Sequence, residues 1–230
     1  MMKIYIGFDE KEQAAVDVAV KTLRKVSGME AELLRADRLR DAGMLWRMTD
    51  HRGGQAYDLV SNAPKSTAFA ASRFVVPLLC QSGWALFSDC DVVFLRNPLE
   101  MLGEIEPGKA VYVVKHDHRP AEQWKMVNKV QTAYPRKNWS SVMLFDCGHP
   151  ANKRLSLHDV NTRPGRDLHA FYWLSDDEIG SLDPAWNWLV DCQPKPDNLG
   201  VAHLTLGGPW LPGWKGGSFD AEWLAASEAP

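Results

Sequence analysis

Apolar and polar positions alternate along the first part of the chain as they do in strands and amphipathic helices. Residues 3–8 alternate like a short strand, and apolar positions between Ala14 and Val26 recur at helical spacing until Ser27-Gly28 closes the helix. Residues 31–36 have the pattern of a second strand. This order predicts an α/β fold that opens with a right-handed strand–helix–strand unit.

The stretch from Trp84 to Leu95 interrupts this regular pattern. Two apolar runs, residues 84–87 and 92–95, flank Asp89-Cys90-Asp91, and such runs are typical of strands buried on both faces. Carboxylates two residues apart on an extended chain point the same way and repel each other unless a cation lies between them. A divalent metal is the natural candidate. The alternative is a strand end whose Asp residues face solvent or cap a turn, which the apolar flanks disfavour.

Further apolar runs predict the rest of the sheet. Strands are expected at residues 110–114 and 186–190, and a short amphipathic helix at residues 219–226. Two other stretches lack a clear period: residues 37–64, to which we assign no role, and residues 119–137, which would suit an acceptor-side insertion.

Two histidines, His116 and His118, lie just before the second irregular stretch. They are candidates either for metal binding or for the rim of an acceptor site. The rim is favoured, because a histidine pair without nearby carboxylates is a weak metal signal.

Composition predicts an ordinary globular protein with one domain over residues 1–230. The chain is 45% hydrophobic and 24% charged, and its net charge of -3 gives no general reason to bind nucleic acid. No apolar run approaches the roughly 20 residues of a membrane helix, and the N-terminus turns polar too soon for a secretory signal. The expected location is cytoplasmic, with peripheral membrane contact left open. The cysteines are too scattered for a zinc site or a disulfide framework: Cys80, Cys90, Cys147 and Cys192.

Asp89-Cys90-Asp91 resembles the Asp-x-Asp metal site of nucleotide-sugar glycosyltransferases with the GT-A fold. Together with the preceding run Ser72–Pro77, it is similar to glycosyltransferase family 8, in which an Arg-containing helix precedes the metal strand. The resemblance implies a GT-A fold, a Rossmann-like mixed sheet flanked by helices. It also implies that Arg73 contacts the nucleotide. The alternative for Arg73 is an exposed position on the outer face of its helix.

Two other segments resemble donor-binding elements of family 8. The turn at Phe8 and Asp9 matches the one that holds the nucleotide base, so Phe8 would line the base pocket and Asp9 would accept from the uracil or ribose; a plain helix cap at Asp9 is the alternative. Asn138 begins a segment similar to the Asn-x-Gly-Val strand, whose asparagine contacts the donor sugar. Ser140 and Ser141 depart from it, because small Ala and Gly are usual there.

The acidic run Asp176-Asp177-Glu178 resembles the helix start that carries the family's residue nearest the anomeric carbon. By position, Asp176 would hold sugar hydroxyls, and Asp177 occupies the place of an amide in some members. Both are therefore candidate catalytic residues. The alternative is ordinary capping of a helix N-terminus, although three consecutive acids exceed what capping requires.

The segment from His203 to Lys215 is the second strong match. In family 8 a late histidine completes the metal site, and a Gly-rich segment and a lysine bind the diphosphate. His203 would thus be a metal ligand, Gly208 would approach phosphate, and Lys215 would neutralise the leaving nucleotide. The alternative for His203 is a satisfied core residue.

The resemblance implies a retaining glycosyltransferase that uses a nucleotide sugar. Asp89, Asp91 and His203 suit Mn²⁺ or Mg²⁺, and the imidazole favours Mn²⁺. The expected donor is a UDP-sugar, and the acceptor is a glycan or another hydroxyl compound. Without an unambiguous carboxylate nucleophile, front-face substitution fits better than double displacement. Two other functions stay open: a nucleotidyl- or phosphotransferase, and a catalytically silent nucleotide-sugar or glycan-binding protein.

Overall fold

The computed structural model describes residues 2–116, 124–125, 129–130, 136 and 138–229. Within these residues the centre is a six-stranded mixed sheet with strand order β12-β8-β11-β6-β1-β2, in which β11 alone runs antiparallel to its neighbours. The α/β fold predicted from the sequence is therefore confirmed. The strands are β1 (Lys3–Gly7), β2 (Glu32–Leu34), β6 (Trp84–Ser88), β8 (Val111–Val113), β11 (Val142–Asp146) and β12 (Ile179–Ser181).

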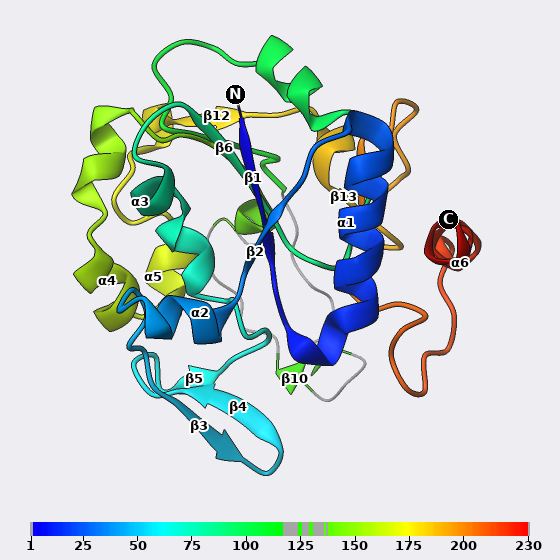
Figure 1. Ribbon diagram of the computed structural model, residues 1–230, viewed down its shortest axis with the longest axis horizontal. Coiled ribbons are helices and arrows are strands. Elements are labelled where there is room, and N and C mark those ends of the chain that lie inside the picture. The colour runs from blue at the N-terminus through cyan, green and yellow to red at the C-terminus, as the bar shows by residue number, and fades with distance from the viewer. Residues whose placement is uncertain (1, 117–123, 126–128, 131–135, 137, 230) are drawn as a thin grey trace.

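Helices cover both faces of this sheet, which explains why β6, β8 and β11 are almost wholly apolar and buried. Figure 1 shows α1 on one side of the central strands and α3, α4 and α5 on the other. Helix α1 ends at Gly28, whose φ of 68° is the left-handed conformation that glycine adopts without strain. The helices are α1 (Gln13–Ser27), α3 (Val76–Cys80), α4 (Leu157–Thr162) and α5 (Gly165–His169).

A second, three-stranded sheet begins where β6 stops. Its order is β13-β14-β7, with bounds β13 (Trp188–Leu189), β14 (Val201–His203) and β7 (Val92–Phe94). The apolar runs on either side of Asp89-Cys90-Asp91 therefore belong to different sheets. Val93, Trp188 and the C-terminal helix α6 (Asp220–Glu228), which packs beside α1, form a separate small core here.

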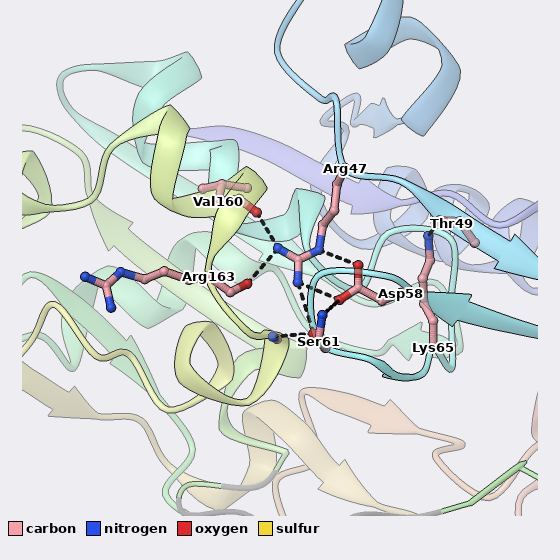
Figure 2. Close-up of polar contacts among 8 residues, drawn as sticks. Arg47, Thr49, Asp58, Ser61, Lys65, Val160 and Arg163 are labelled. Atoms are coloured by element: carbon pink, nitrogen blue, oxygen red, sulfur yellow. Dashed lines mark hydrogen bonds and ion pairs between the residues drawn. The ribbon is translucent and has the colours of Figure 1, made fainter.

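Residues 37–64, for which the sequence indicated no role, form a small unit of their own. It consists of α2 (Ala36–Asp41) and an antiparallel sheet of β3 (Thr49–Arg52), β4 (Gln55–Asp58) and β5 (Ala63–Pro64). Figure 2 shows how Arg47 joins this sheet to α4: its guanidinium forms a buried 2.6 Å ion pair with Asp58 and donates to the carbonyls of Val160 and Arg163. Arg47 thus helps to anchor the unit, together with hydrogen bonds that Asn161 and Gly165 make to it.

The Arg-containing helix implied by the family resemblance lies where the run Ser72–Pro77 indicated. A 3₁₀ helix, η2 (Ser72–Val75), leads into α3, and Pro77 lies in the first turn of α3, where a missing N–H costs nothing. The remaining short elements are η1 (Glu10–Glu12), η3 (Pro98–Gly103), β9 (Trp124–Lys125), β10 (Lys129–Val130), η4 (Trp139–Ser141), η5 (Pro150–Arg154), η6 (Asp176–Glu178) and η7 (Pro184–Asn187).

Among the described residues, the helices are all too short or too polar to cross a membrane.

Candidate active site

Asp89 and Asp91 lie in the connection between β6 and β7, at the carboxyl edge of the central sheet. The Asp89 backbone N–H donates to the carbonyl of Ser141, and the Asp91 carbonyl accepts from the N–H of Leu204. Strand β14 runs antiparallel to β7 with His203 paired to Val92. This register brings His203 to the carboxylates, and possible ligand atoms of Asp89, Asp91 and His203 all lie within 4.8 Å of one another.

The orientation of the His203 ring follows from its neighbours. His203 is buried, and its Nδ1 lies 2.9 Å from Oδ1 of Asn187, while its Nε2 lies 3.3 Å from Oδ1 of Asp91. Asn187 Oδ1 can only accept, so His203 Nδ1 carries a proton. In the neutral ring Nε2 is then an acceptor that faces a carboxylate, and two acceptors this close need a proton or a cation between them.

This donor set fits a divalent cation. Two carboxylates and one imidazole nitrogen form the mixed oxygen and nitrogen environment that Mn²⁺ accepts readily and Mg²⁺ accepts less well. Asp89, Asp91 and His203 are thus the residues that could hold a metal, as the sequence predicted. Metal binding by them is part of the function proposed below.

Arg73 is buried behind Asp89, so the exposed alternative for this residue is wrong. Its Nη1 lies 2.7 Å from Asp89 Oδ1 and donates at 2.8 Å to the carbonyl of Ser140. The guanidinium lies 5.2 Å from the ring centroids of both Phe69 and Phe87. These contacts satisfy the charge of Arg73 through a carboxylate and a carbonyl, and they fix the position of the Asp89 side chain.

The turn at Asn138 leads into β11 next to this pair. Asn138 has a φ of 63°, and its carbonyl accepts from the Asn187 side-chain amide at 3.3 Å. Ser140 is buried, and its hydroxyl lies 2.6 Å from Nδ1 of His169. Burial, followed by the charges of Arg73 and Arg47, holds the pKa of His169 well below its usual value, so this ring is neutral. Both serines that depart from the family pattern thus have contacts in the fold: the Ser140 hydroxyl with His169, and the Ser141 carbonyl with the N–H of Asp89.

Phe8 and Asp9 follow β1 at the same edge of the sheet. The Arg35 guanidinium lies 4.2 Å from the centroid of the Phe8 ring, and Phe8 is buried. The Asp9 carboxylate caps η1 by accepting from the N–H of Lys11, and it also accepts from the N–H of Ala68 at 2.8 Å. Asp9 is therefore a helix cap, and its remaining lone pairs are available to a further donor.

Asp176 and Asp177 are not brought into the cluster. They form η6 ahead of β12, and β12 starts at Ile179, which pairs with Val111 at the amino end of β8. They therefore precede the strands, whereas Asp89 follows a carboxyl end. The Asp176 side chain is 91% exposed and pairs with Arg136. The cap of η6 is Ser175, completed by Glu178, so capping accounts for Glu178, and the catalytic role of Asp176 and Asp177 stays a prediction.

Gly208 and Lys215 lie in the loop that follows β14. A methyl group on Gly208 would overlap the ring of Trp210, so packing of this tryptophan already requires glycine at position 208. Lys215 is exposed. The packing of Trp210 is therefore sufficient to explain the glycine at position 208. Contact of Gly208 and Lys215 with phosphate stays a prediction.

One curated protein is similar over nearly the whole chain. Protein CDI of Arabidopsis thaliana is 40% identical over 236 residues, which cover 98% of this chain and 86% of that protein. The chain belongs to the Protein CDI family. Comparison with models of known protein families gave no match.

Solved structures of glycosyltransferases share the fold. The chain aligns with GlyE of Streptococcus pneumoniae TIGR4 at a TM-score of 0.59 and 14% identity, over 100% of this chain and 60% of GlyE. The galactosyltransferase LgtC, solved with donor and acceptor sugar analogues, aligns at 0.57 and 14% identity, over 99% and 95% of the two chains. The bifunctional enzyme WbbM aligns at 0.63 and 12% identity, over 99% of this chain and 49% of WbbM. This member of the Protein CDI family thus has the GT-A fold.

Sequence reasoning missed several residues around the cluster. Asn187 stands between two tryptophans, and a lone amide in an apolar run was the signal that could have found it. His169 lies in α5, far from Ser140 in sequence, and no local pattern indicated their contact. His116 is buried and contacts Gln193; the metal cluster found among the described residues does not include it. His118 and most of residues 119–137 lie outside the described residues.

Proposed function

We propose that this chain is a metal-dependent glycosyltransferase related to family 8. It would move a hexose from a nucleotide sugar, with UDP as the nucleotide, to an acceptor hydroxyl with retention of configuration. The observation that carries this proposal is the cluster of Asp89, Asp91 and His203 at the carboxyl edge of a GT-A sheet. Ligands of open α/β sheets bind at this edge.

Asp89, Asp91 and His203 would hold Mn²⁺ or Mg²⁺. When bound, the cation supplies Lewis-acid charge that stabilises the departing nucleoside diphosphate. Arg73 keeps one oxygen of Asp89 in place through its 2.7 Å ion pair. Arg73 is buried behind Asp89, so it would act on the nucleotide mainly by holding the Asp89 carboxylate in place. This is a narrower role than the direct contact that the family resemblance implies.

The donor would lie across the ends of β1, β6 and β11. Asp9 has acceptor capacity left for a base or ribose N–H or O–H, and Phe8 lies next to it under Arg35. Asn138 lies in the turn before β11, beside the connection between β6 and β7 that carries Asp89. It would contact the sugar. Lys215 would add positive charge near the leaving diphosphate.

Transfer by front-face substitution fits the described residues. The acceptor oxygen would form a bond to the anomeric carbon while the bond from that carbon to the phosphate oxygen breaks. The departing phosphate oxygen would take the acceptor proton, so no protein carboxylate is needed as a nucleophile. This route does not require Asp176 or Asp177, which lie at the amino ends of the strands.

Ligand-induced stabilisation tests the proposal directly. With Mn²⁺ and UDP at about one hundred times their dissociation constant, linkage adds about 2.7 kcal/mol, which raises the melting temperature of a chain of this size by roughly 5–10 °C. Asp91→Ala and His203→Ala should abolish the shift, whereas His158→Ala, at an exposed histidine, should retain it. Release of UDP from a panel of UDP-sugars then measures turnover. No shift with any nucleoside diphosphate, or equal shifts in all variants, would refute the metal site.

A catalytically silent nucleotide-sugar-binding protein is the second candidate. The exposure of Asp176 and its distance in the fold from the cluster favour it, because the acidic residues expected near the anomeric carbon are elsewhere. Such a protein would show the same thermal shifts but no release of UDP from any donor, with or without acceptors.

A further inference from the structure

Asn187 joins two parts of the site that come from different sheets. It ends η7 and is fully buried, and its side chain makes two hydrogen bonds. One is the 2.9 Å contact between its Oδ1 and Nδ1 of His203, and the other runs from its Nδ2 to the carbonyl of Asn138 at 3.3 Å. A single amide therefore touches both the candidate metal histidine and the turn before β11.

Chemistry fixes which way this amide points. A backbone carbonyl can only accept, so the Asn138 carbonyl must face the Asn187 NH₂ group. The Asn187 oxygen then faces His203, whose Nδ1 must donate. The other ring nitrogen, Nε2, is consequently directed at Asp91, on the side of the ligand cluster, and it is the nitrogen that could bind a metal ion. Hydrogen bonds of this kind orient histidine ligands in metal proteins and set which nitrogen binds the ion.

The carbonyl of Asn138 has two hydrogen-bond contacts. Asn138 itself holds a φ of 63°, a left-handed conformation that asparagine adopts more readily than most residues other than glycine. Its carbonyl is held by Asn187, with a longer contact to the Ser141 N–H at 3.5 Å. The hydrogen bond from the Asn187 amide is thus the shorter of the two that the Asn138 carbonyl accepts.

We infer that Asn187 is a positioning residue that sets the tautomer of His203 for metal binding and ties it to the Asn138 turn. The inference rests on the proposed function and adds that metal and donor sites are coupled through one amide. Only an amide fits both contacts. A carboxylate at this position would accept from His203 but could not donate to Asn138, and a leucine would do neither.

These chemical differences define two variants. Asn187→Leu keeps the approximate volume and should weaken Mn²⁺ binding in the presence of UDP by about 10- to 100-fold, as expected for loss of a partner that orients a metal ligand. Asn187→Asp keeps the acceptor for His203 and should bind Mn²⁺ at least as tightly as wild type. It should raise amide hydrogen exchange at residues 138–141 by about five- to tenfold, the size expected for one lost hydrogen bond. Asn198→Asp, at an exposed site between β13 and β14, controls for the added charge.

Free Mn²⁺ measured by electron paramagnetic resonance gives the affinities, and mass spectrometry gives the exchange rates. If Asn187→Leu does not fold, the Mn²⁺ affinity and the amide exchange of Asn187→Asp are sufficient to test the inference. A loss of Mn²⁺ affinity in Asn187→Asp, or unchanged exchange at residues 138–141, overturns the inference. Wild-type binding that His203→Ala abolishes and Asn187→Leu leaves intact overturns the inference but leaves the proposed function standing. Absence of Mn²⁺ binding by the wild type refutes both.

Discussion

Replacing Arg73 with methionine should destabilise the protein strongly, because the substitution leaves a buried carboxylate without its cation. The side chains of Arg73 and Asp89 are only 5% and 12% exposed, and their charged atoms are 2.7 Å apart. Removing one member of a buried ion pair costs about 3–5 kcal/mol. For a chain of this length each kcal/mol corresponds to roughly 2–4 °C, so Arg73→Met should lower the melting temperature by about 6–20 °C.

Removing the charge of Asp89 as well should restore part of the stability lost in Arg73→Met. Asp89→Asn removes the orphaned charge, so the double variant should recover at least half of the loss in a thermal melt at pH 7. Because a divalent cation brings positive charge to the same carboxylates, Mn²⁺ should stabilise Arg73→Met more than wild type. Arg24→Met, at an exposed ion pair with Glu30, should stay close to wild type.

Two results would refute this reasoning. A loss of less than about 2 °C in Arg73→Met would mean that water solvates Asp89 and that the pair is not buried in solution. A double variant as unstable as the single one would mean that Arg73 contributes through packing between aromatic rings, and not through its charge.

Three other properties can be checked by chemical or thermal denaturation. Arg47→Met should lower the free energy of unfolding by about 3–5 kcal/mol, since it strands Asp58 in the interior; an unchanged urea midpoint would contradict the anchoring role of Arg47. Burial alone raises the pKa of Asp58, but the hydrogen bonds it accepts, chiefly from Arg47, outweigh this and lower it. Because the folded pKa is below the ordinary value of 3.8, this stability is present above that value and is lost as the pH falls through the folded pKa. Asp58→Asn should therefore be less stable at neutral pH and show a flatter decline in acid, and a parallel decline would count against the shift. Gly180→Ala should cost about 1–3 kcal/mol because its methyl group would overlap the Tyr112 ring, whereas Gly103→Ala meets no atom and should change little; equal effects would show that the ring moves aside.

Local patterns were sufficient to predict much of the fold and the core of the site. The apolar runs and helical spacing near the N-terminus correspond to β1, α1 and β2, because each of these elements buries a face that its own sequence encodes. The carboxylates Asp89 and Asp91 stood out because charge interrupted an apolar stretch. His203 was found through its resemblance to a family, and the structure places it in the same cluster.

Contacts between distant segments could not be predicted in the same way. The acidic run at Asp176 and Asp177 is similar to a catalytic motif, yet capping of a short helix uses the same residue types, and only strand register distinguishes the two. Arg47 and Asp58 are close in sequence, but the carbonyls of Val160 and Arg163 that complete the contacts of Arg47 lie more than one hundred residues further along the chain. The role of Asn187 could not be predicted because its hydrogen-bond partners, Asn138 and His203, lie in other segments of the chain.

The pairing of β7 with β14 has a consequence for how the protein matures. Asp91 and His203 are more than one hundred residues apart in the chain, and they meet only when these two strands align. Contacts of such long sequence separation form late and slowly during folding. A chain still emerging from the ribosome would hold both carboxylates long before it acquires the histidine. In the proposed function, tight metal binding needs all three residues, so it would be confined to chains in which β7 and β14 have already paired.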